Sequence, residues 1–133
     1  MPDDPQLDVD GDQIVVIIMT SGPSARERCA TPFYLGSLLA AMDAQVHIFF
    51  TMEGVRLMEK GVAENLTAME GGKRIIDFIR DAKRAGVILH VCQPALPGYR
   101  IDADSALIGE VDHVSRAGTL AELILSCNKV FSF

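Results

Sequence analysis

The chain contains 133 residues and has a mass of 14.4 kDa, which is the size of one ordinary domain. Apolar residues make up 49% of the sequence and charged residues 23%, so the composition predicts a globular fold and excludes wholesale disorder. The net charge of −6 argues against nucleic-acid binding, because phosphate-binding surfaces are built from clustered Lys and Arg.

The beginning of the chain and its cysteines predict a cytoplasmic protein. Residues 1–12 are acidic and lack the basic segment and apolar stretch of a signal peptide, so we expect a flexible acidic arm followed by a single domain over residues 13–133. The apolar run Ile14–Met19 is far shorter than the ~20 residues that cross a bilayer. The three cysteines are too far apart for a metal knuckle and form no disulfide framework, so we expect a reduced protein without a metal or cofactor.

The hydrophobic pattern predicts strands that alternate with helices. Uniformly apolar segments rich in β-branched residues are typical of strands covered on both faces, and they predict strands over residues 14–19, 46–51, 87–92, 111–114 and 129–133. Helical spacing of apolar residues predicts helices over residues 75–85 and 117–126. A short helix is expected over 53–60, and one or two helical turns over 104–109. This alternation predicts an α/β three-layer sandwich with a mainly parallel sheet of about five strands, flavodoxin-like or Rossmann-like, and leaves the strand order open.

The helix after the first strand has two predicted starting points. Ser24 and Glu27 have capping-box spacing, which favours one long helix that bends at Pro32. Alternatively, Thr31 is the N-cap and Pro32 occupies the first helical position, where its missing N–H costs nothing. The pattern slightly favours the long, bent helix.

Chemistry is expected at the carboxyl ends of the strands, where open parallel sheets bind their ligands. Cys92 closes an apolar strand and opens a loop with two prolines, which suits a nucleophilic thiolate near solvent, although the packing of a small apolar side chain explains the same pattern slightly better. His90 shares a face with Cys92 on a regular strand and could activate it, but a core histidine is the simpler interpretation. For Cys29 and Cys127 a structural role is favoured.

The turn Thr20–Ser24 precedes a predicted helix and could hold an anion at the helix N-terminus. It lacks both the Gly-Lys-Ser/Thr of a phosphate-binding loop and the Gly-x-Gly-x-x-Gly of a dinucleotide site. Capping and turn formation explain these residues adequately.

Several segments resemble the DsrE/DsrF/TusD sulfur-relay family, also called DsrE-like. They are the opening strand Ile14–Met19, the segment Val46–Thr51 followed by Met52-Glu53-Gly54, the strand Val87–Val91 that ends in Cys92, and Leu120–Leu123 leading to Lys129–Phe131.

The resemblance implies a flavodoxin-like fold, homo-oligomers (trimers or hexamers), and a cytoplasmic sulfur carrier or sulfurtransferase. Sulfane sulfur would pass as a persulfide on Cys92 between sulfur-donor and sulfur-acceptor proteins, with a TusA-like carrier as a candidate partner. The substrate pocket expected around Cys92 is formed by Met19, Thr20, Thr51, Met52, Gln93 and Leu96. Two alternatives remain open: a non-catalytic assembly subunit of a sulfur-metabolism complex, and a small-ligand-binding module that uses the Thr20–Ser24 turn.

Overall fold

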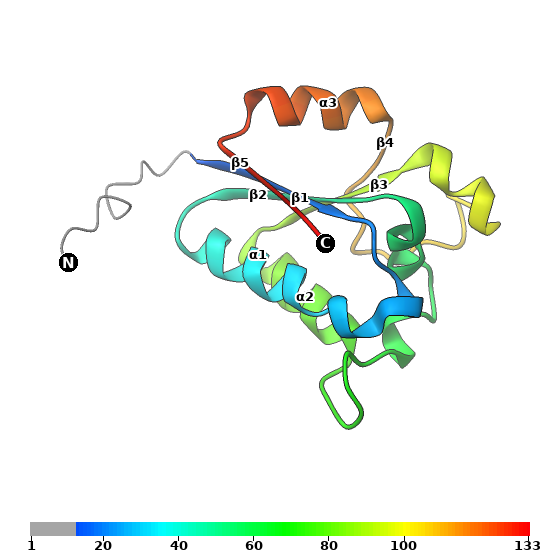
Figure 1. Cartoon of the computed structure of the whole chain (residues 1–133). Helices are drawn as coiled ribbons and strands as arrows, with labels where there is room; N and C mark the ends of the chain where they lie inside the picture. Colours follow the sequence, from blue (N-terminus) through cyan, green and yellow to red (C-terminus); the bar gives the residue numbers. More distant parts are fainter. Residues whose placement is uncertain (1–12) are drawn as a thin grey trace.

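The computed structural model describes residues 13–133 as a five-stranded, all-parallel sheet flanked by helices (Figure 1). The arm predicted over residues 1–12 lies outside the described residues. The strand order is β4-β3-β2-β1-β5. The strands are β1 (Ile14–Met19), β2 (Gln45–Phe50), β3 (Ile88–Cys92), β4 (His113–Ser115) and β5 (Lys129–Ser132).

The helices lie on both faces of the sheet, which confirms the predicted three-layer α/β architecture. Helices α1 (Thr31–Ala41) and α2 (Ile75–Ala85) cover one face, and α3 (Ala117–Ser126) lies over the other (Figure 1). Strands β1 to β4 advance across the sheet in one direction and the chain then returns to place β5 beside β1, so right-handed crossovers put α3 opposite α1 and α2. Flavodoxin itself places its first strand between its second and third, whereas here β1 lies between β2 and β5.

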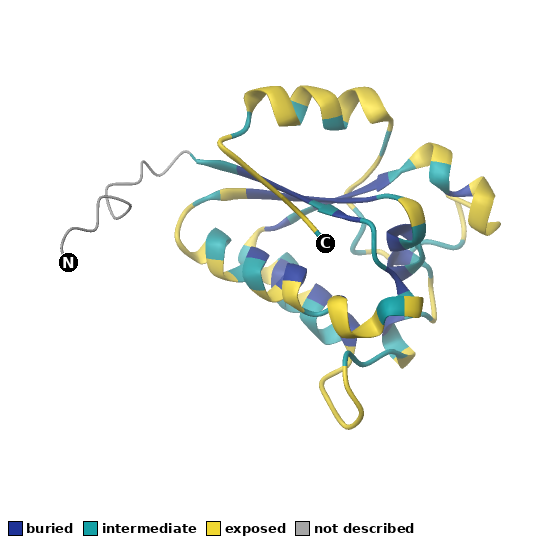
Figure 2. Ribbon diagram, viewed as in Figure 1, coloured by how far each residue is buried: buried dark blue, intermediate teal, exposed yellow. Residues whose placement is uncertain are grey.

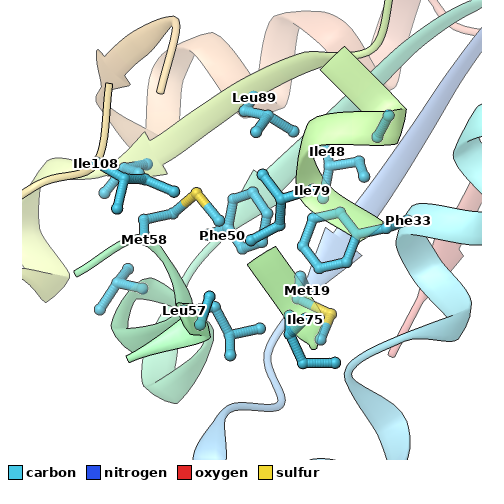
Figure 3. Close-up of a cluster of buried hydrophobic side chains, with 14 of the residues drawn as sticks. Met19, Phe33, Ile48, Phe50, Leu57, Met58, Ile75, Ile79, Leu89 and Ile108 are labelled. Carbon is cyan, nitrogen blue, oxygen red and sulfur yellow. The ribbon is translucent and has the colours of Figure 1, made fainter. Parts of the chain in front are cut away.

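The main core lies between the sheet and the α1–α2 layer (Figure 3). Alternate residues of β1, β2 and β3 point into it, and Phe33 of α1 stacks on Phe50 of β2 with ring centroids 5.8 Å apart. The opposite face of the same strands carries Val16 and Phe49, which are also buried. Burial on both faces explains why these strands are apolar at successive positions instead of alternating.

The first helix begins at Thr31, with Ala30 as its N-cap and Pro32 in its first turn, so the long, bent helix was the wrong expectation. The later start is confirmed, but Thr31 is the first helical residue and not the N-cap. Residues Pro23–Arg28 form a separate 3-10 segment. The capping box is also wrong: Ser24 makes no cap hydrogen bond, and its hydroxyl donates to the carboxylate of Glu53 instead.

The other predicted helices are confirmed where their apolar periodicity is long. Helix α2 ends at Ala85 and is capped by Gly86, whose φ of 99° is the left-handed conformation that glycine favours. The short helix expected over 53–60 is a 3-10 segment, Met52–Met58, and the turns over 104–109 form no helix. Within residues 13–133, the structure contains no helix that is both long and apolar enough to traverse a bilayer.

Candidate functional site

Hydrogen bonds join the loops that follow β1 and β2 at the carboxyl edge of the sheet. The backbone N–H of Thr51 donates to the carbonyl oxygen of Met19 at 3.0 Å. The Glu53 carboxylate accepts hydrogen bonds from the Ser24 N–H at 2.9 Å and from the Ser24 hydroxyl, which is the main reason why the pKa of Glu53 is lowered. A carboxylate therefore occupies the N–H and hydroxyl of Ser24, which disfavours the anion-binding interpretation of the turn.

Cys92 lies at this same edge as the last residue of β3. Its register partner is Ser115 of β4, and its side chain is half-buried. A 3-10 turn, Gln93–Ala95, follows at once and carries the chain away from the sheet. The structure thus holds a free thiol on a rigid strand end, at the edge where parallel sheets bind ligands.

The other two cysteines lie in different environments. Cys29 is fully buried, its sulfur lies 3.3 Å from the carbonyl oxygen of Gly22, and burial together with the charges of Glu53 and Glu27 raises its pKa to about 11. A thiol with that pKa carries almost no thiolate at neutral pH. Cys127 follows α3 and precedes β5, so it lies near the amino edge of the sheet, away from Cys92.

His90 does not pair with Cys92 in this structure, because both of its ring nitrogens have other partners. Its Nε2 lies 2.9 Å from Nδ1 of His47 on β2, and its Nδ1 lies 3.3 Å from Oγ of Ser115 on β4. His90 also stacks on Phe49 and contacts the ring of His113. Burial is the main cause of the lowered pKa values of both histidines: the pKa of His47 lies below its usual value, and that of His90 is about 4. Both rings are therefore neutral at neutral pH.

Sequence reasoning missed this cluster of histidines. His47 on β2 and His90 on β3 are both buried on the face of the sheet opposite the main core. Only the register between these two strands brings the rings together. A lone histidine inside each of two apolar strands was the available signal. Within the part of the chain that the structure describes, no group of three or more His, Cys, Asp or Glu side chains is arranged to hold a metal ion.

The apolar residues predicted around Cys92 differ in exposure. Met19 and Leu96 are buried and belong to the core, because the strand end and the loop after β3 turn these side chains inward. Met52 is 62% exposed and has a φ of 52°, an uncommon conformation for a residue other than glycine. Of these three apolar side chains, Met52 is therefore the one that is exposed at the carboxyl edge.

The polar residues predicted for the pocket surround the same edge. The hydroxyl of Thr20 donates to the carbonyl oxygen of Phe133 at 2.9 Å, Thr51 is half-buried, and Gln93 is exposed. Thr20 and Thr51 follow β1 and β2, whereas Gln93 follows Cys92 directly.

Comparison with known proteins now identifies the family. The model of the DsrE/DsrF-like family matches residues 13–133, which is nearly the whole chain. This chain belongs to the DsrE/DsrF-like family. The family is generally linked to sulfur relay, as the sequence resemblance implied.

Solved structures share the DsrE-like fold. YchN from E. coli has a TM-score of 0.73 at 18% identity, over 92% of this chain and 99% of that chain. A protein of unknown function from Bacteroides thetaiotaomicron, BT1422, has a TM-score of 0.60 at 11% identity, over 91% and 95%. MTH1491 from Methanobacterium thermoautotrophicum, also of unknown function, has a TM-score of 0.55 at 15% identity, over 90% and 97%. A search of curated proteins finds no significant match.

Proposed function

We propose that this DsrE-like protein carries sulfane sulfur as a persulfide on Cys92, passing it from a donor protein to an acceptor protein. The observation that carries the proposal is the position of Cys92: a free, half-buried thiol that ends β3 at the carboxyl edge of a parallel sheet. Membership of a family linked to sulfur relay supports it. A reduced compartment such as the cytoplasm would keep this thiol free.

The transfer is a thiolate exchange and needs no oxidant or reductant. The Cys92 thiolate attacks the outer sulfur of a donor persulfide, a new S–S bond forms on Cys92, and the donor's inner sulfur leaves as a thiolate. In the second step an acceptor thiolate attacks the outer sulfur on Cys92, and Cys92 leaves as a thiolate. The oxidation level moves with the sulfur atom, so a TusA-like carrier would serve chemically as either partner.

A sulfur-loading experiment compares Cys92 with Cys127, the other cysteine that is only half-buried. After incubation with a small persulfide donor, the tryptic peptide that contains Cys92 is expected to gain about 32 Da, and dithiothreitol is expected to remove the gain. Cys92→Ser should abolish loading, whereas Cys127→Ser should retain it, because Cys127 lies near the opposite edge of the sheet.

Unchanged loading in Cys92→Ser would contradict the proposal. A wild-type protein that takes no sulfur while it still binds a sulfur-carrier protein would instead support a non-catalytic assembly subunit.

We also propose that copies of this chain assemble through the outer surface of α1. The resemblance implies trimers or hexamers, and such assemblies need an interface between subunits. No residue of α1 is charged, and the outward side chains of Tyr34, Leu38 and the C-cap residue Met42 are 59%, 46% and 70% exposed. Exposed positions recur along this helix in Figure 2. An apolar groove of about 250 Å³ lies beside them, and Leu39, Met42 and Phe131 of β5 line it together with residues of β1 and the loops. A helix that is apolar on all sides is normally covered.

Replacing Leu38 with aspartate is expected to shift the protein from oligomer to monomer, because it would place a charge in the proposed interface. Analytical ultracentrifugation at several concentrations measures the mass. Leu125→Asp is the matched control: Leu125 is 88% exposed but lies on α3, at the opposite face of the sheet, so the oligomer should persist. A wild-type monomer at all concentrations would contradict the proposal.

A further inference from the structure

A chain of hydrogen-bonding side chains crosses three neighbouring strands on the face of the sheet under α3. It begins at Gln45, whose Oε1 lies 3.0 Å from Nε2 of His47. Nδ1 of His47 lies 2.9 Å from Nε2 of His90, and Nδ1 of His90 lies 3.3 Å from Oγ of Ser115. Both histidines are buried, while Gln45 at the start of β2 is exposed. The four side chains therefore connect solvent at one edge of the sheet with Ser115 at the other.

The chain ends beside Cys92. Ser115 and Cys92 are register partners on β4 and β3, and neighbouring strands lie about 4.8 Å apart. Strand alternation places Cys92 on the same face as His90, two residues earlier, although at the strand end its side chain also packs against the main core. The contact of Ser115 Oγ with His90 shows that the serine hydroxyl lies on the His90 face. A hydrogen bond between Ser115 and Cys92 requires the serine side chain to rotate, because its hydroxyl contacts His90 in the structure.

The direction of the chain follows from its first member. An amide oxygen only accepts, so His47 donates from Nε2 and its Nδ1 must accept from Nε2 of His90. Nδ1 of His90 then accepts from the hydroxyl of Ser115. The free lone pairs of the Ser115 oxygen remain available for the thiol hydrogen of Cys92. If the amide of Gln45 turns to present its NH₂ group, every hydrogen bond reverses. Ser115 then accepts from Nδ1 of His90, and its hydroxyl hydrogen is free to be donated to the sulfur of Cys92.

We propose that this chain, Gln45–His47–His90–Ser115, relays the proton of Cys92 and then stabilises the Cys92 thiolate through the hydroxyl of Ser115. The inference rests on the proposed function, because it concerns the thiolate that accepts sulfur. Ser115 acts on the sulfur directly, and His90 and His47 are positioning residues that act through Ser115.

The relay is balanced in protons and needs no charged ring at its end. The Cys92 proton passes to Ser115 Oγ, the serine proton to Nδ1 of His90, and the Nε2 proton of His90 to Nδ1 of His47. The Nε2 proton of His47 leaves to water beside the exposed Gln45. Each ring starts and finishes neutral, which agrees with the burial that lowers the pKa of His47 and His90. At the end, Ser115 donates to a thiolate, and hydrogen bonds to charged groups are the stronger kind.

The first test measures how fast iodoacetamide alkylates Cys92 between about pH 6 and pH 9, read from the Cys92 peptide by mass spectrometry. Ser115→Ala is expected to slow alkylation about fivefold at pH 7, because the thiolate loses a hydrogen bond. Ser115→Thr keeps the hydroxyl and should retain the wild-type profile. Ser132→Ala, on the far edge strand β5, is the matched control and should also leave the profile unchanged.

The second test acts on the remote end of the chain. A Gln45→Glu carboxylate can only accept, so it holds Ser115 as a donor to His90 and is expected to slow Cys92 alkylation at pH 7 by a fewfold. Repeating the measurement in about 1 M salt, where the screening length is about 3 Å, removes a through-space effect of the new charge and should leave the slowing in place. Gln45 is exposed, so the variant is expected to fold.

The outcomes separate this inference from the proposed function. If wild-type Cys92 takes up sulfur but Ser115→Ala and Gln45→Glu alkylate as fast as wild type, the relay is overturned and the sulfur carrier stands. If both variants slow alkylation while wild type takes up no sulfur, the relay stands and the proposed function falls.

Discussion

Replacing Gly54 with alanine is expected to lower the free energy of unfolding by about 3 kcal/mol, because the added carbon has no room. A Cβ on Gly54 would lie 2.2 Å from the carbonyl oxygen of Met19. That oxygen belongs to the backbone at the end of β1 and accepts a hydrogen bond from the N–H of Thr51. Relieving the clash therefore means separating the two loops that form the carboxyl edge.

Urea unfolding monitored by circular dichroism measures this effect at fixed protein concentration. Gly118→Ala is the matched control: it lies in the first turn of α3, nothing is within 4 Å of its added Cβ, and alanine has a higher helix propensity than glycine. We expect the control to be as stable as wild type or more so. A Gly54→Ala variant of wild-type stability would show that the two loops separate at little cost.

Acidification from about pH 7 to about pH 5 is expected to cost the folded protein about 2 kcal/mol through His90. The pKa of His90 is about 4 in the folded protein, against an ordinary value of 6.5, which applies to the unfolded chain. The folded state thus binds fewer protons than the unfolded state between these values, so this stability is complete above pH 6.5 and is lost as the pH falls toward 4. His47, whose pKa is also lowered, adds a loss of the same sign.

The contribution of His90 is isolated by comparing wild type with His90→Gln, which does not titrate. The variant is expected to be less stable at pH 7, because a hydrogen bond and a ring stack are changed, and to lose clearly less stability on acidification. Urea unfolding at both pH values gives the difference. Equal losses in the two proteins would show that His90 is not held neutral by burial. The comparison stays above the range in which Glu53 and Asp112, with their lowered pKa values, are protonated.

The sequence predicted the architecture well where the apolar pattern was long and unambiguous. Helices α2 and α3 and the first three strands follow from spacing that only one secondary structure satisfies. The start of α1 did not follow, because Pro32 is compatible with both a bend and a first turn. Ser24 satisfied a capping pattern in the sequence, yet its hydroxyl bonds to Glu53, a partner 29 residues away that no local pattern contains.

The candidate site was predictable only in part, for a related reason. The position of Cys92 at a strand end is local information, and the structure places it at the carboxyl edge as a half-buried thiol. The partner of His90 is not local: periodicity puts His90 and Cys92 on one face, but the register of β2 and β4 gives the ring His47 and Ser115 instead. Burial of Met19 and Leu96 likewise depends on how the loops fold over the core.

The exposed thioethers of Met42, Met52 and Met69 have a practical consequence for detecting bound sulfur. Each can be oxidised to a sulfoxide, which adds about 16 Da, so two oxidised side chains add about 32 Da and match one sulfur atom in nominal mass. An intact-mass spectrum of an aged sample can therefore imitate a loaded protein. Dithiothreitol removes the persulfide sulfur from a cysteine but leaves methionine sulfoxides in place. Loss of the added mass from the Cys92 peptide on reduction therefore distinguishes bound sulfur from methionine oxidation.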